Sequence, residues 1–179
     1  MNMSSLNEIE HNEPVNAAHL PRWNELPDLD IYMDQVISLI GRYFQNFPGI
    51  GEKSLTSSMV NNYVKLEIIP PPTKKKYNKV HLAYLVILCV LKTVIPIPMI
   101  RDLIASTVID STSYETLYDR FCDNFESAVA SARSTVESML DRKTSVSDLA
   151  FFSAIRSHSE QAIALQLIRF MTAEEESKA

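Results

Sequence analysis

The chain has 179 residues, 46% of them hydrophobic, which is enough to bury the core of one ordinary domain and excludes a chain that is disordered throughout. Its formal net charge of −5 is the opposite of what a uniformly basic nucleic-acid-binding protein carries. The apolar run Leu82 to Leu91 is too short to cross a bilayer, so the sequence predicts no membrane partner.

The first residues predict a tail that precedes the folded part. Residues 1–19 are polar and acidic, lack a signal-peptide pattern and are expected to be flexible. The proline-bounded segment after them holds the only tryptophan, Trp23, which we expect to pack with Leu26 onto a neighbouring element. A helix is then predicted to begin at Asp28 or Asp30, because acidic residues suit a first turn. Its apolar face would comprise Ile31, Val36, Ile37, Leu39, Ile40, Tyr43 and Phe44.

The next predicted helix follows a glycine-containing turn over residues 46–52. That turn has no lysine–serine pair after its glycines, so a phosphate-cradling loop is not expected. Thr56 or Ser57 suits the N-cap of the helix, because a hydroxyl can accept a hydrogen bond from the first turn. One face would be apolar, with Met59, Val60, Tyr63, Val64 and Leu66, and the other polar, with Ser57, Ser58, Asn61, Asn62 and Lys65.

A basic hairpin is predicted between this helix and the next. Pro70-Pro71-Pro72 cannot continue a helix, so residues 68–77 are expected to form a strand, a turn and a second strand. An apolar helix from about Val80 to Val94 follows, with His81 on its polar surface, and then a short helix from about Pro98 to Ile104.

Charge is distributed unevenly along the chain. From Lys53 to Arg101 there are eight Lys or Arg against the single acid Glu67, a net of +7, so the remaining residues carry −12. Lysines neutralise phosphate and amide side chains pair with adenine edges. The polar helix face and the lysines after it therefore have the composition of a groove-reading helix with a basic wing.

These segments resemble the winged helix-turn-helix of MerR-type regulators. The resemblance is carried by Asn61 to Pro72, by the basic residues Lys74 to Tyr77, by the leucine-rich helix after them, and by Pro96 to Ile104. From Leu20 onward the chain also resembles an uncharacterised Gram-positive family of unknown function that carries this block. The resemblance implies a MerR-like domain over residues 20–104 that binds double-stranded DNA in transcription regulation. Implied major-groove contacts are Ser57, Ser58, Asn61, Asn62 and Lys65, and implied phosphate contacts are Lys74, Lys75, Lys76 and Lys79.

Three positions depart from the MerR pattern and leave a second hypothesis open. The family usually has Arg at the position of Asn61, an aromatic residue at that of Asn62, and Gly at that of Glu67, where a helix C-terminus takes a left-handed conformation. The missing arginine and the net acidity favour a protein-interaction or ligand-sensing helical module that keeps the fold without binding DNA.

The C-terminal part predicts a helical hairpin over residues 105–173. Ala105 to Ser111 reads as a connector, and Thr112 to Glu115 as a capping box that opens a helix to about Leu140. A second helix would run from Ser145 to about Met171, followed by an acidic tail over residues 174–179. We expect the hairpin to form a homodimer, because two helices alone leave one side uncovered. The expected inner face of the second helix is Leu149, Phe152, Ile155, Ala162, Ile163, Gln166, Leu167 and Phe170.

Chemistry-bearing residues are scattered, so the sequence predicts neither an enzyme nor a need for a metal or cofactor. Cys89 and Cys122 lie in apolar patterns and are expected to be buried free thiols, which fits a reducing cytoplasm. Asp119, Asp123 and Glu126 share a helix face that is expected to be solvated. The predicted fold class is mostly α: a MerR-like winged helix-turn-helix with a small β wing, followed by a C-terminal helical hairpin.

Overall fold

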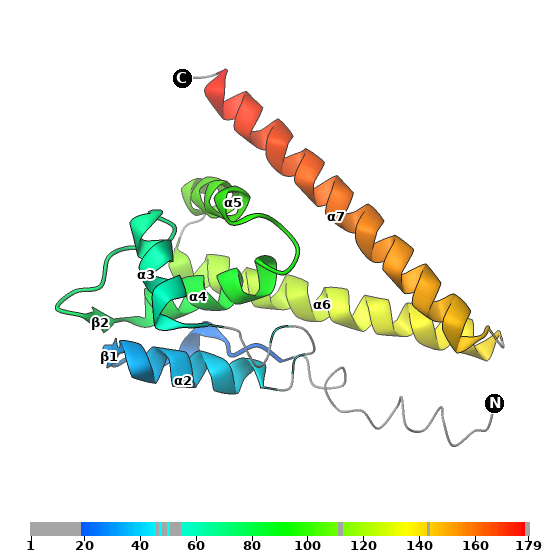
Figure 1. Cartoon of the computed structure of the whole chain (residues 1–179), viewed down its shortest axis with the longest axis horizontal. Coiled ribbons are helices and arrows are strands. Elements are labelled where there is room, and N and C mark those ends of the chain that lie inside the picture. The colour runs from blue at the N-terminus through cyan, green and yellow to red at the C-terminus, as the bar shows by residue number, and fades with distance from the viewer. Residues whose placement is uncertain are drawn as a thin grey trace.

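The computed structural model describes residues 19–45, 47, 50, 55–110, 113–142 and 144–177. The predicted tail before His19 and most of the predicted turn over residues 46–52 lie outside these residues. The described part is mostly helical with one short two-stranded sheet, as predicted (Figure 1). Its elements are η2 (Trp23–Glu25), β1 (Ile31–Tyr32), α2 (Met33–Phe44), α3 (Ser57–Lys65), β2 (Lys76–Tyr77), α4 (Lys79–Leu91), α5 (Ile97–Asp110), α6 (Tyr114–Asp141) and α7 (Val146–Glu176).

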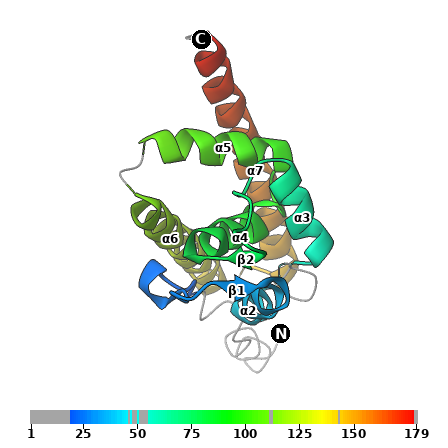
Figure 2. The same cartoon turned by 90° about the vertical axis from the view of Figure 1, so that its left-hand side faces the viewer.

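The core is built around α4. Every residue from His81 to Val90 is buried, because α2, β2 and the first half of α6 contact this helix from different sides (Figure 2). A helix that is apolar on all faces must be surrounded by other elements, and the run of apolar residues in this sequence predicted that. Tyr118 and Cys122 of α6 belong to the same core, so the packing continues beyond residue 104, where the sequence suggested a boundary.

The small sheet corrects the predicted start of α2. Ile31 pairs with Tyr77 and Tyr32 with Lys76 in antiparallel register, so the two residues form strand β1 and α2 begins at Met33 instead of Asp28 or Asp30. Strand pairing with β2 outweighs the acidic first-turn signal, because Ile and Tyr suit a half-buried sheet edge. The Gln35 side-chain oxygen then accepts a 2.9 Å hydrogen bond from the Tyr32 N–H at the start of α2.

Two further boundaries differ from those predicted. Helix α4 ends at Leu91 instead of Val94, and α5 runs on to Asp110 through the segment that was expected to be a connector. The Thr107 hydroxyl donates to the Leu103 carbonyl one turn earlier, and Ile104 is buried against the core. No glycine or proline interrupts residues 99–110, so tertiary packing extends the helix despite its β-branched residues.

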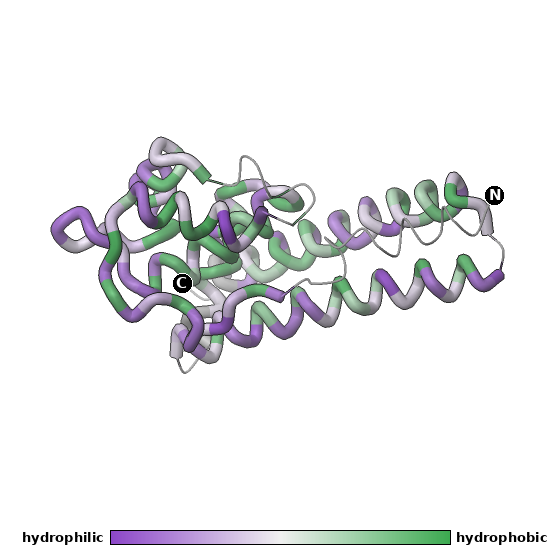
Figure 3. Tube along the Cα trace, turned by 90° about the horizontal axis from the view of Figure 1, so that it is seen from below, coloured by the Kyte–Doolittle hydropathy of each residue, from purple (hydrophilic) through white to green (hydrophobic). Residues whose placement is uncertain are grey.

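The two long helices form an arm that extends beyond the rest of the molecule (Figure 3). Helix α6 starts within the predicted segment but is capped one residue later than the Thr112–Glu115 box, with the Ser113 hydroxyl accepting from the Thr116 N–H at 3.1 Å. Helix α7 diverges from α6 and crosses α5, where Ile168 is buried (Figure 1). It continues through Glu176, over the first half of the predicted acidic tail.

The predicted inner face of α7 is wrong. Of its eight residues only Leu149 is buried, whereas the large apolar side chains of the set are exposed. The face that packs inward is shorter and less apolar, with Gln161, Leu165, Ile168 and Met171. The most apolar stripe of α7 therefore faces solvent.

Candidate nucleic-acid interface

Helix α3 presents a polar face at one end of the molecule, opposite the junction of α6 and α7 (Figure 1). The Thr56 hydroxyl caps it by accepting from the Met59 N–H at 3.3 Å, which confirms one of the two predicted N-caps. Val60 and Tyr63 are buried, so the helix has one orientation on the core. All five predicted groove residues are exposed on the other side: Ser57, Ser58, Asn61, Asn62 and Lys65.

The chain leaves α3 through a left-handed residue. Glu67 has φ 57°, and its N–H donates to the Val64 carbonyl at 3.0 Å. The Ile68 N–H donates to the Tyr63 carbonyl at 3.0 Å, and both of these side chains are buried. This pair of bonds is a Schellman motif, whose left-handed position favours glycine. Glu67 therefore takes the left-handed conformation that glycine takes in the MerR pattern, and its β-carbon makes this conformation strained.

The wing consists of a tight turn whose two central residues are lysines. Lys74 and Lys75 have φ 51° and 65°, and the Lys76 N–H donates to the Thr73 carbonyl at 3.0 Å. Two consecutive positive φ angles closed by that bond make a type I′ turn, which normally carries Asn-Gly. The first strand that was expected before this turn does not form. Residues 68–72 have no regular secondary structure, Thr73 forms only an isolated bridge with Lys76, and β2 pairs with β1 instead. Pro70, Pro71 and Pro72 have no N–H to donate to a neighbouring strand, which explains why residues 68–72 do not pair.

The four predicted phosphate lysines differ in their surroundings. Lys74 and Lys75 are exposed at the turn, and the Lys76 ammonium lies 5.3 Å from the centroid of the Tyr32 ring. Lys79 is largely covered, forms an ion pair with Asp28 at 2.5 Å, and lies over the Trp23 ring. The basic surface that is open to a ligand therefore comprises Lys65, Lys74, Lys75 and Lys76.

His81 lies behind the wing and corrects the expectation of a surface histidine. It is 4% exposed, its ring packs edge-on against Tyr77, and it exchanges hydrogen bonds with Asn78 at the start of α4. Its Nε2 has no hydrogen-bond partner within the described residues. Burial lowers the pKa of His81, opposed by the backbone carbonyls of Pro70 and Pro71 and by the charge of Asp30.

The acidic face of α6, which was expected to be solvated, is engaged by the N-terminal segment, although Asp123 remains exposed. Arg22 contacts Asp123 at 2.8 Å and Glu126 at 2.6 Å, and the Trp23 N–H donates to Asp119 at 2.8 Å. The Tyr118 hydroxyl donates to the Pro21 carbonyl at 2.7 Å. These contacts fix the segment before η2 on α6. The spacing of the acidic residues predicted the acidic face, but nothing in the sequence indicated that Arg22 and Trp23, about 100 residues earlier, are its partners.

Comparison with known proteins identifies the family. Residues 21–121 match a family described as a domain of unknown function, DUF1836. The chain belongs to this family. No curated protein and no solved structure matches the chain.

The DUF1836 match begins in the N-terminal segment and ends in α6 at Phe121, so it includes α3, the wing and the core. The outer part of α6 and all of α7 lie beyond it.

Other site chemistry in the DUF1836 chain is limited. Cys89 and Cys122 are buried thiols, as predicted, and burial raises the pKa of each thiol to about 11. The described residues contain no group of three or more His, Cys, Asp or Glu placed to hold a metal ion. Among the helices described, none has the length and apolarity needed to span a bilayer.

Proposed function

We propose that this protein binds double-stranded DNA as a transcription regulator, with α3 in the major groove and the lysine wing on the flanking phosphates. The observation that carries the proposal is the type I′ turn at Lys74 and Lys75. Two lysines occupy left-handed positions at which Asn-Gly would be unstrained, and strain of this kind persists where function requires it. The strained turn exposes two lysines and lies at the same end of the molecule as α3 (Figure 1).

The composition of the α3 face supports base reading. Asn61 and Asn62 are exposed amides, which can make paired hydrogen bonds to an adenine edge, and Ser57 and Ser58 can bond to either base or backbone. The MerR-type arginine and aromatic residue are absent at positions 61 and 62. Phosphate contact then depends on Lys65 and the wing.

Base reading can be tested with a site selected from random duplexes. Replacing Asn62 with Ala should cost about 1–3 kcal/mol at the selected site and little on random DNA, if its amide bonds an adenine edge. Equilibrium titration of both duplexes by fluorescence anisotropy measures this. The matched control is Gln45→Ala, an exposed amide directly after α2 that should change neither affinity. Failure to enrich any sequence, or equal losses on both duplexes, would contradict base reading.

We further propose that two copies associate through α7. Gln161 donates to the Val94 carbonyl, and five exposed apolar side chains lie on the opposite face of α7: Phe152, Ile155, Ile163, Leu167 and Phe170. They are between 39% and 65% exposed, so at roughly 200 Å² for a large side chain each copy leaves roughly 600 Å² uncovered. Pairing two copies would bury roughly 1,200 Å², the size at which specific interfaces begin.

The spacing of this α7 stripe is self-complementary. Phe152 and Phe170 are equally far from Gln161, as are Ile155 and Leu167. An antiparallel pair centred at Gln161 would therefore place Phe152 against Phe170 and Ile155 against Leu167 of the second copy. Such a two-fold dimer presents two reading helices to two half-sites.

A further inference from the structure

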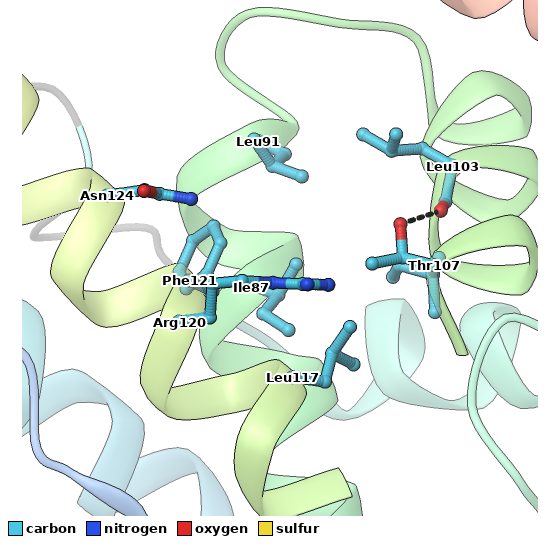
Figure 4. Close-up of a pocket in the computed structure, with 9 residues that line it drawn as sticks. Ile87, Leu91, Leu103, Thr107, Leu117, Arg120, Phe121 and Asn124 are labelled. Atoms are coloured by element: carbon cyan, nitrogen blue, oxygen red, sulfur yellow. Dashed lines mark hydrogen bonds between the residues drawn. The ribbon is translucent and has the colours of Figure 1, made fainter. Parts of the chain in front are cut away.

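A pocket lies where α5 crosses α4 and α6 (Figure 4). Its volume is about 150 Å³, and each of the three helices contributes to its wall. A dry apolar cavity of about 150 Å³ accommodates a benzene ring. The lining residues are Ile87, Leu91, Leu103, Ile104, Thr107, Leu117, Arg120, Phe121 and Asn124.

The pocket has an apolar floor and a polar edge. Ile87, Ile104 and Leu117 are buried and supply hydrocarbon surface, while Arg120 and Asn124 are exposed where the pocket reaches solvent. Figure 4 shows the Arg120 side chain extending from α6 toward Thr107 on α5. The arrangement suits a ligand with one apolar end and one polar end.

The polar edge selects the charge of the ligand. A guanidinium has five N–H donors and no acceptor, and Arg120 is exposed at the pocket edge, where it can donate to an oxygen of a ligand. The Thr107 hydroxyl already donates to the Leu103 carbonyl at 2.6 Å, which leaves its oxygen only as an acceptor. A guanidinium matches a carboxylate with two parallel hydrogen bonds, and a cationic ligand would be repelled.

We propose that this pocket binds a small monocarboxylate with a single aromatic ring or a branched aliphatic body. The apolar body would fill the space between Ile87, Leu103 and Leu117, and the carboxylate would meet Arg120. The inference goes beyond DNA binding and does not depend on it. Helix α4 forms one wall of the pocket and begins directly after β2 of the wing, so a bound ligand would contact the helix that supports the candidate interface.

The test uses the full chain, benzoate as the probe, and protein NMR of methyl-labelled Ile and Leu. Benzoate should shift the methyl signals of Ile87, Leu103 and Leu117 along a saturable curve, with a dissociation constant on the order of 1 mM or lower. Acetate at equal ionic strength, which lacks the ring, and benzylamine, which reverses the charge, should leave these signals in place.

Two variants assign the site. Arg120→Met should weaken benzoate binding about tenfold, whereas Arg133→Met, which removes the same charge farther along α6, should not. Leu103→Phe fills the pocket and should abolish the shifts of the Ile87 and Leu117 methyl signals. If Arg120→Met does not fold, this second variant alone tests whether benzoate binds in the pocket. Unchanged benzoate affinity in a folded Leu103→Phe variant, shifts confined to residues outside the pocket, or equal responses to acetate would overturn the proposal.

Discussion

Glu67 occupies the left-handed position that ends α3, and the bonds around it explain why it remains there. The Schellman motif bonds the backbone at Val64 and Tyr63, and the burial of Ile68 fixes the direction in which the chain leaves the helix. A β-carbon in this conformation costs about 1–2 kcal/mol, which the surrounding bonds outweigh. The MerR resemblance indicated a left-handed position here, and the structure adds the bonds that hold it.

Replacing Glu67 with Gly should therefore stabilise the fold by about 1 kcal/mol, because glycine takes a positive φ without steric strain. Urea denaturation followed by circular dichroism measures the change. Glu67→Gln removes the charge but keeps the β-carbon, so it should lie within about 0.5 kcal/mol of the wild type. Equal stabilisation by both variants would mean that charge, not backbone conformation, is the cause.

His81 illustrates what a sequence pattern at a helix start does not reveal. It follows Asn78 and Lys79, as a surface residue would, yet β2 and the carbonyls of Pro70 and Pro71 cover its ring. The aromatic contact with Tyr77 depends on how the wing folds back over α4. No local spacing carries that information.

The stability of the fold should depend on His81 near neutral pH. Its folded-state pKa is lowered from the ordinary value of 6.5, so between the two values the unfolded chain binds a proton that the folded chain does not. The free energy of unfolding should fall as the pH drops below about 7, by at most about 1.4 kcal/mol per pH unit. His81→Gln should reduce this pH dependence.

The matched control for this experiment is His158→Gln, because His158 is exposed on α7. Denaturation series between pH 5 and 8, on the order of the range in which histidine titrates, compare the three proteins. If His158→Gln and the wild type share one slope and His81→Gln has a smaller one, the buried ring is the source. A slope unchanged by His81→Gln would refute this assignment.

At the scale of elements, α7 shows the limit of periodicity. Its large apolar residues recur at helical spacing, and such a stripe usually marks the side of a helix that packs inward. The described structure turns the stripe outward, while Gln161 and Ile168 face α5 and the end of α4. Periodicity identified the apolar face correctly but gave no indication of what covers it.

The proposed α7 pairing predicts a response to charge. Ile155→Glu with Leu167→Glu would place two carboxylates opposite each other and should give monomers in light scattering at tens of micromolar. Ile155→Lys with Leu167→Glu would place opposite charges together in the antiparallel pair and should restore the dimer. In a parallel pair each residue would meet its own copy, so the second variant would also be repelled.

Both positions are exposed in a single chain, so neither double variant should change the helical signal or the stability by more than about 0.5 kcal/mol per site. A wild-type monomer at tens of micromolar would contradict the pairing. A dimer that survives both glutamates would place the contact on another surface.

At the scale of the whole molecule, much of the domain could be predicted and its long-range contacts could not. The cap at Thr56 and the buried α4 follow from local residue types, and the structure has them as predicted. Strand β1 and the segment bound by Glu126 required knowledge of partners distant in the sequence. The exposure of the groove residues and of Lys74 and Lys75 followed from sequence, whereas the partial burial of Lys79 did not. The left-handed lysine turn did not follow either, because Lys-Lys is not a type I′ signature.

Charge separation along the chain also supports the DNA-binding proposal. The net charge of −5 would repel DNA if it were spread evenly, but the acids lie mainly outside the segment from Lys53 to Arg101. At an ionic strength near 0.15 M, charges more than about 8 Å apart are largely screened from each other. The acids near the junction of α6 and α7 would then oppose phosphate binding by Lys74 and Lys75 little, while Asp28 is engaged in its ion pair with Lys79.

The most direct test of this account is the salt dependence of binding to a random-sequence duplex. With Lys65, Lys74, Lys75 and Lys76 on phosphate, the logarithm of affinity should fall against the logarithm of salt by about 3.6 per protomer. Lys74→Asn with Lys75→Gly should reduce that slope by about 1.8 per protomer and also stabilise the fold, because Asn-Gly suits the type I′ turn.

Removing two equal charges from the outer part of α6, by Arg133→Gln with Arg142→Gln, should leave the slope unchanged. A wild-type slope near 3.6 per protomer that falls by half only in the wing variant is the predicted result. Absence of salt-sensitive DNA binding by the wild type, or a slope that the wing variant leaves unchanged, would contradict the proposed interface.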